Sequence, residues 1–110
     1  MKSELGIISS GVIMFNGHVY SWFNERKPGL VRHEVFFGKN RQNSIKYGLV
    51  IFIKPEDHNG ETYGVHCKSG HEFDGFIKAL AQMQAMRYYN WSIRDFRAIF
   101  GKSYIGEWHV

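Results

Sequence analysis

The residues best able to bind a charged ligand gather in one stretch, from Phe23 to Lys46. Six lysines or arginines stand here against two glutamates, and six minus two gives +4, the formal net charge of the whole 110-residue chain. Cations that contact phosphates, interleaved with rings that stack on bases, are typical of nucleic-acid binding. A solvated strand and loop would carry the same residues, so both interpretations stay open. The predicted phosphate contacts are Arg26, Lys27, Arg32, Lys39, Arg41 and Lys46, and the predicted stacking rings are Trp22 and Phe36.

Six histidines form the second group of residues with chemical potential. Imidazole can bind a transition metal or transfer a proton near neutral pH. The chain has none of the short His or Cys spacings of common zinc motifs, so spacing predicts no metal site. A site assembled across strands from His18, His33 and His66 stays open. The catalytic alternative is a metal-free ribonuclease that uses His33 or His66 with a nearby Lys or Arg. We expect cap or surface roles for His58, in a turn, and His71, in the first turn of a helix.

Length and composition predict one globular domain over residues 1–110. The single cysteine, Cys67, excludes an intrachain disulfide and fits a reducing compartment. The longest apolar run, residues 49–53, is far too short to span a bilayer, and no signal peptide is recognisable. We therefore expect a cytoplasmic protein that has no membrane partner.

Alternating residues predict an antiparallel hairpin over residues 12–23. Its centre is Asn16-Gly17, the dipeptide best suited to a type I′ turn. A two-residue loop fixes the register, so that Phe15 faces His18 and Ile13 faces Tyr20. Side chains alternate between the faces of a strand, and both faces of this hairpin are largely apolar. The face that holds Phe15 and Tyr20 is either a core packed under helices, which the usual burial of aromatic residues favours, or an exposed stacking platform.

Further strands are predicted over residues 30–37, 45–53 and 61–68, with a polar loop over 38–44 and a turn over 55–60. Ser69 with Glu72, and Ser92 with Asp95, form two capping boxes, which begin two helices. Strands followed by helices predict an α+β fold, an antiparallel meander of four to five strands with the two C-terminal helices packed on one face. A small β-barrel capped by the helices is the alternative.

The second predicted helix ends at Gly101 and carries Arg94 and Arg97 away from its apolar stripe, with Lys102 following. These cations could lie against phosphates. The stripe of Phe and Ile favours burial as the main role of this helix.

Two segments resemble parts of cold-shock domains. Residues 17–27 (GHVYSWFNERK) are similar to the first strand of that family, which often reads GxVxWFN, and residues 52–57 (FIKPED) with Val65-His66 are similar to later segments. The resemblance implies an OB barrel on which Trp22, Phe23 and His66 stack on bases. The chain departs from the family by a long insertion between these segments, by the absence of the paired aromatics and by two additional helices. We therefore assign no family.

These observations together favour a small, basic, non-enzymatic accessory or regulatory protein that binds DNA or RNA and needs no cofactor. One alternative is a compact protein of the kind that phages and mobile elements encode, which inhibits or adapts a host protein through a sheet edge or an aromatic patch. The other is the metal-free ribonuclease that depends on His33 and His66. A homodimer is compatible with each.

Overall fold

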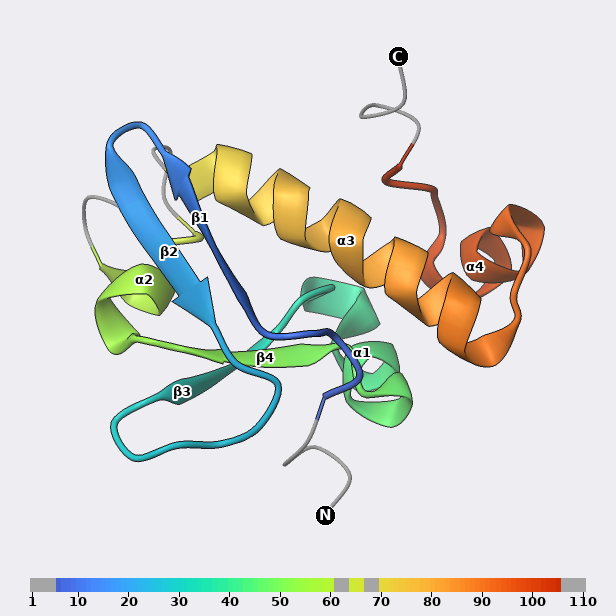
Figure 1. Cartoon of the computed structure of the whole chain (residues 1–110). Coiled ribbons are helices and arrows are strands. Elements are labelled where there is room, and N and C mark those ends of the chain that lie inside the picture. Colours follow the sequence, from blue (N-terminus) through green and yellow to red (C-terminus); the bar gives the residue numbers. More distant parts are fainter. Residues whose placement is uncertain (1–5, 61–63, 67–69, 106–110) are drawn as a thin grey trace.

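The computed structural model describes residues 6–60, 64–66 and 70–105. Within these residues the chain is an α+β fold with two antiparallel two-stranded sheets, β1–β2 and β3–β4 (Figure 1). The strands are β1 (Gly11–Phe15), β2 (His18–Trp22), β3 (Val31–Glu34) and β4 (Val50–Ile53). The helices are the short 3₁₀ turn η2 (Gly38–Asn40), α1 (Arg41–Tyr47), α2 (Pro55–Asn59), α3 (His71–Tyr89) and α4 (Ile93–Phe100).

The first hairpin has the predicted turn and register. Asn16 and Gly17 both take positive φ, 54° and 78°, as a type I′ turn requires. Phe15 pairs with His18 and Ile13 with Tyr20. The aromatic face is core, because the Tyr20 ring stacks on Phe73 of α3 with 4.3 Å between centroids. The stacking-platform alternative is therefore wrong for this face.

The opposite face of the hairpin remains in solvent. Val12, Met14 and Val19 all point to this side, and they are 63%, 61% and 45% exposed. One helix layer covers only one face of a two-stranded sheet, so the second apolar face has no cover among the described residues.

The second sheet joins the first through a single bridge. Phe23, just after β2, exchanges two backbone hydrogen bonds with Phe52 of β4, of 3.0 and 2.9 Å. The predicted meander of four to five strands is not confirmed, because α1 occupies residues 41–47, where a polar loop and the start of a strand were expected. Gly48 ends α1 with φ 74°, and the strand begins only at Val50.

Two further expectations change in the second half of the chain. The predicted turn over residues 55–60 is the short helix α2. Of the strand predicted over 61–68, residues 64–66 form a turn, and the remainder lies outside the described residues. The α3 cap is Gly70 rather than Ser69, which also lies outside them.

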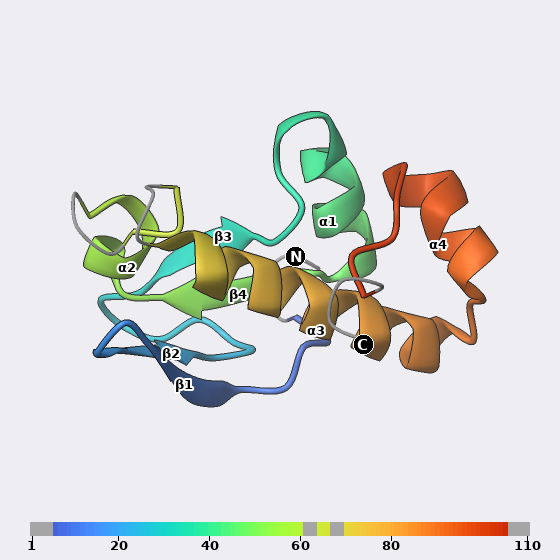
Figure 2. The same ribbon diagram turned by 90° about the horizontal axis from the view of Figure 1, so that it is seen from above.

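The predicted α4 is confirmed with its capping box. The Ser92 hydroxyl accepts a hydrogen bond from the Asp95 amide, and the Asp95 carboxylate accepts one from the Ser92 amide. Gly101 ends the helix at φ 94°. Viewed from above, α3 runs along the molecule, with α2 near its start and α4 beyond its end (Figure 2). No helix in the described part of the chain is long and apolar enough to cross a membrane.

A buried serine connects α1 to the chain that follows β3. The Ser44 hydroxyl donates to the Phe36 carbonyl at 2.7 Å and accepts from the Phe36 amide at 3.0 Å. Ser44→Ala would leave both buried backbone groups unpaired, and we expect a loss of about 2–4 kcal/mol in unfolding free energy. The matched change Ser92→Ala removes an exposed cap and should cost about 1 kcal/mol. Urea titrations with an unchanged m-value measure both, and equal losses would contradict the assignment.

Candidate metal centre

Three histidines from three segments meet beside the start of α3. His33 comes from β3, His58 from α2 and His66 from the turn over residues 64–66. Their ring centroids are 5.2 Å (His33–His58), 5.6 Å (His33–His66) and 5.1 Å (His58–His66) apart. One ring nitrogen from each lies within 4.8 Å of the other two. These three residues, the histidine cluster, could together hold a metal ion. The sequence left open a site formed by His18, His33 and His66, and the structure has His58 in place of His18.

Local sequence explains how two of these rings meet. β3 and β4 are antiparallel, and His33 lies opposite Ile51. Lys54 follows β4, and Pro55 is the first residue of α2. The fixed φ and missing N–H of proline favour a helix start at this position. The chain therefore turns back at the end of β4, and His58, in the last turn of α2, lies beside His33.

A single buried aspartate holds the two more exposed ligands in place. The Asp57 carboxylate lies 2.8 Å from His18 Nε2 of β2, and the Asp57 carbonyl accepts a 2.8 Å hydrogen bond from the Val65 amide. His58 and His66 directly follow Asp57 and Val65 in the chain. His18 is therefore not one of the three clustered histidines, and Asp57 links it to His58, the next residue in the chain.

Burial differs across the cluster, so that one side is closed and the other open. His33 is 1% exposed, His58 is half-buried and His66 is exposed. Catalytic zinc sites have three protein ligands and a fourth position for water or substrate. The cluster has this kind of arrangement, because solvent can reach it from the His66 side.

The electrostatics favour the neutral forms of His33 and His58. The pKa of His33 is lowered from 6.5 to about 3, first by burial and then by the neighbouring His58, His66 and Lys78 in that order. The pKa of His58 is also lowered, first by burial and then by His66, while Glu34 opposes the shift. Neutral imidazole is the form that binds a metal. His33 Nε2 is buried and has no hydrogen-bond partner among the described residues, which is uncommon for a polar atom and marks a functional candidate.

A cation and a carboxylate border the cluster. The Phe37 ring contacts His33 and His66 at centroid distances of 5.9 and 4.8 Å, and Lys78 Nζ lies 4.2 Å from the Phe37 centroid. Lys78 also pairs with Asp74 at 2.9 Å. Burial raises the pKa of Asp74, and the positive charge of Lys78 opposes this.

The two rings predicted to stack on bases are not available for that role. Trp22 is 3% exposed, and its indole N–H donates to the Ser9 carbonyl at 2.7 Å. Phe36 is 1% exposed and packs against Phe96 and Phe100 of α4. Their burial corrects the prediction, because neither ring can present a face to a ligand.

The six predicted phosphate contacts separate into two groups. Arg32 and Arg41 converge on Glu34, at 2.8 and 3.4 Å, next to His33, and Lys39 lies two residues before Arg41. The other three lie elsewhere, each beside a ring. Arg26 and Lys27 are in the loop after β2, where Arg26 lies over the Phe52 ring and Lys27 over the Phe23 ring. Lys46 lies over the Tyr47 ring at the end of α1. Lys27 also lies 3.8 Å from Glu25.

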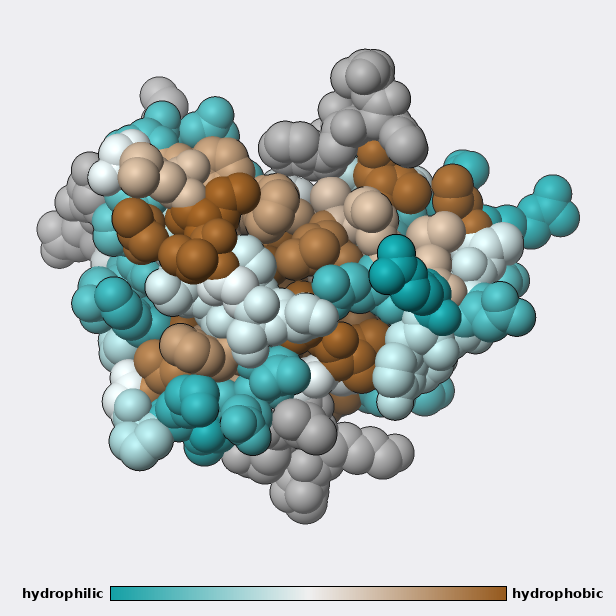
Figure 3. All heavy atoms as spheres, viewed as in Figure 1, coloured by the Kyte–Doolittle hydropathy of each residue, from teal (hydrophilic) through white to brown (hydrophobic). Residues whose placement is uncertain are grey.

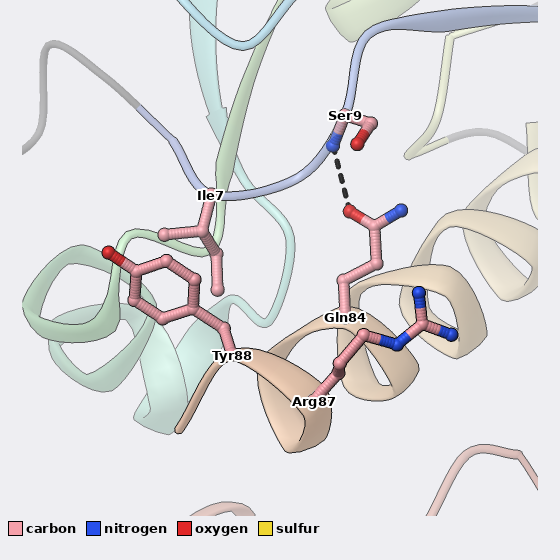
Figure 4. A pocket seen from close by; sticks show the side chains of 5 residues that line it. All are labelled: Ile7, Ser9, Gln84, Arg87 and Tyr88. Carbon is pink, nitrogen blue, oxygen red and sulfur yellow. Dashed lines mark hydrogen bonds between the residues drawn. The ribbon is translucent and has the colours of Figure 1, made fainter. Parts of the chain in front are cut away.

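Two surface hollows lie away from the histidine cluster. One, of about 250 Å³, lies between the N-terminal segment and the end of α3 (Figure 4). There the Gln84 side chain accepts a 2.8 Å hydrogen bond from the Ser9 amide, while the Tyr88 ring lies beside Ile7 and the Arg87 side chain beside Gln84. The other, of about 440 Å³, is on α4 and is lined by Arg94, Arg97, Ala98 and Gly101.

Comparison of the chain with protein-family models, with curated proteins and with solved structures finds no match. Function must therefore be argued from the residues alone.

The lowered pKa of His33 predicts a pH dependence of stability in the metal-free protein. As pH falls below 6.5, His33 becomes protonated in the unfolded chain, whereas in the folded chain it stays neutral down to about pH 3. Stability is therefore greatest above pH 6.5 and should fall by roughly 1 kcal/mol per pH unit between about pH 6 and 4. Denaturant titrations with chelator present measure this slope. His33→Gln should flatten it, whereas His71→Gln, at the exposed start of α3, should not, and an unchanged slope in His33→Gln would contradict the assignment.

Proposed function

We propose that His33, His58 and His66 bind one zinc ion and that the protein is a metal-dependent phosphodiesterase acting on nucleic acid. The observation that carries the proposal is the convergence of three imidazoles, one of which has a buried nitrogen without a hydrogen-bond partner among the described residues, His33 Nε2. Imidazole ligands suit zinc and neighbouring transition metals. Tetrahedral zinc with Zn–N bonds of 2.0–2.1 Å needs nitrogens about 3.3 Å apart, so small rotations of the two less buried rings would complete the site.

The chemistry would follow from the open fourth position. Zinc lowers the pKa of a bound water to about 7, which supplies hydroxide at neutral pH. The hydroxide oxygen forms a bond to phosphorus while the bond to the leaving sugar oxygen breaks. The water proton leaves to solvent, and the leaving oxygen takes a proton from solvent. Lys78, whose positive charge already acts on His33, would stabilise negative charge on the phosphate.

The surrounding charge supports nucleic acid as the substrate. The chain carries a formal net charge of +4. Lys78 supplies a cation at the cluster, because its charge acts on His33 and its Nζ lies over the Phe37 ring that contacts His33 and His66. Cations beside a hydrolytic metal favour a polyanionic substrate. This proposal keeps the nucleic-acid partner that the sequence favours and replaces the non-enzymatic role with a catalytic one.

Metal binding is the first test. Calorimetry with zinc should give one site per chain, and His58→Ala or His66→Ala should weaken binding by more than about 100-fold, because the loss of a ligand exceeds the effect of a supporting contact. His71→Ala is the matched control, since this histidine is exposed and outside the cluster. Equal affinity in all four proteins would remove the metal site from consideration.

Cleavage is the second test. Labelled single-stranded and duplex oligonucleotides should be cut in the presence of zinc, and chelation should abolish cleavage until the metal is restored. His66→Ala should lower the rate at least 100-fold while His71→Ala retains it. Cleavage that survives chelation and depends on His33 and His66 would instead support the metal-free ribonuclease.

One observation favours the host-protein alternative. Val12, Met14 and Val19 form an exposed apolar patch on the outer face of the β1–β2 hairpin. Apolar atoms gather at this end of the molecule in the space-filling view (Figure 3). Patches of this kind are typical of protein-binding surfaces. A partner bound there would leave the histidine cluster free, so this role and the catalytic one are compatible.

A further inference from the structure

The outer face of α4 carries cations that the histidine cluster does not use. Arg94 and Arg97 are three residues apart and therefore share one face of the helix, and both are exposed. They line the hollow of about 440 Å³ with Ala98 and Gly101. The ion pairs formed among the described residues involve other cations. Asp95, the acidic residue of α4, accepts a hydrogen bond in the capping box and forms no ion pair with either arginine among the described residues.

Hydrogen bonds and an ion pair connect α4 with α1 and β3. The start of α1 is fixed to the end of α4, because the Asn40 and Asn43 side chains donate to the Phe100 and Ile99 carbonyls at 3.0 and 3.1 Å. Lys39 and Arg41 flank Asn40 in the chain. Arg41 in turn reaches Glu34, which follows His33. Four cations lie on the elements that these contacts join, α4 and the segment at the start of α1. We call them the basic track: Lys39, Arg41, Arg94 and Arg97.

The arrangement of the elements gives the track a direction. In both ribbon views α2, β3, α1 and α4 follow one another in this order, and from above they lie along one side of α3 (Figure 2). α2 lies near the start of α3 and α4 beyond its end. A helix of 19 residues is roughly 28 Å long at a rise of about 1.5 Å per residue. The metal centre and the α4 arginines therefore lie near opposite ends of this helix, too far apart for one phosphate group to contact both.

We propose that the basic track binds the phosphates of a nucleic-acid strand that extends from the histidine cluster to α4. This inference rests on the proposed function and adds the class of substrate: a polynucleotide rather than a nucleotide or a short fragment. Spaced cations on a fixed surface suit a polymer with regularly spaced charges. A single phosphate could contact only one end of the track.

Binding of labelled oligonucleotides tests the track without requiring catalysis. Fluorescence anisotropy with chelator present compares 4-mers and 16-mers on the intact protein and on the double variant Arg94→Gln/Arg97→Gln. The 16-mer should bind the variant at least 10-fold more weakly, and the dependence of log K on log salt should fall by about 1.4 for a single strand, because two phosphate contacts are lost. Binding of the 4-mer should change less than 3-fold.

A matched double variant separates position from net charge. Arg26, which the sequence predicts as a phosphate contact, lies off the track in this proposal. Arg26→Gln/Arg87→Gln therefore removes the same charge from the loop after β2 and from the hollow of Figure 4. This variant should bind the 16-mer within 3-fold of the intact protein. Equal losses in the two double variants, or equal losses for 4-mers and 16-mers, would overturn the track.

Failure of the track and failure of the catalytic proposal are distinguishable. If oligonucleotides bind with the expected length dependence but zinc produces no cleavage, the track stands and the phosphodiesterase does not. If a small phosphodiester such as bis(p-nitrophenyl) phosphate is hydrolysed equally by the intact protein and by Arg94→Gln/Arg97→Gln, while binding of 16-mers is also equal, the catalytic centre stands and the track is refuted.

Discussion

The arrangement of the histidine cluster depends on two contacts of Asp57, one made by its buried carboxylate and one by its backbone carbonyl. The carboxylate holds α2 against β2 through His18, and the carbonyl holds the turn over residues 64–66 through Val65. A buried carboxylate without such a partner would be costly, so the bond to His18 is required once Asp57 is inside. Because His58 directly follows Asp57 and His66 directly follows Val65, these two contacts of Asp57 determine where the two rings lie.

His33, unlike Asp57, is buried without a hydrogen-bond partner for its Nε2 among the described residues. Its ring is buried with an unpaired Nε2, and burial holds its pKa so low that the ring is neutral at any physiological pH. Leucine or phenylalanine would fill this position without an unpaired polar atom, and on stability alone would be preferred. A buried imidazole that is aimed at two others is understandable if a ligand completes its coordination, since metal binding by the folded protein alone adds to stability.

Local signals predicted the hairpin, α4 and the burial of the aromatic face, since a two-residue Asn-Gly turn and a capping box act over a few residues. The error at residues 41–47 has a tertiary cause. Ile45 and Tyr47 suit a strand, but the double hydrogen bond between Ser44 and Phe36 and the left-handed Gly48 favour a helix there. The site was missed for a related reason: His58 was assigned to a turn, although Pro55 followed by two acidic residues is a typical start for a helix. Only pairing of β3 with β4 then brings it to His33.

The net charge of residues 23–46 does not by itself show which of their cations are available to a polyanion. Arg32 and Lys27 of the basic stretch lie on carboxylates, and their fields are partly cancelled at short range. The cations that lack a carboxylate partner among the described residues include Lys39 and two arginines of α4, some 55 residues further along the chain. Asn40 and Asn43 bring these together by hydrogen bonds to the last carbonyls of α4, which need partners in any case. The same two side chains thus satisfy a helix terminus and fix α1 against α4, a tertiary contact that no pattern in the sequence reveals.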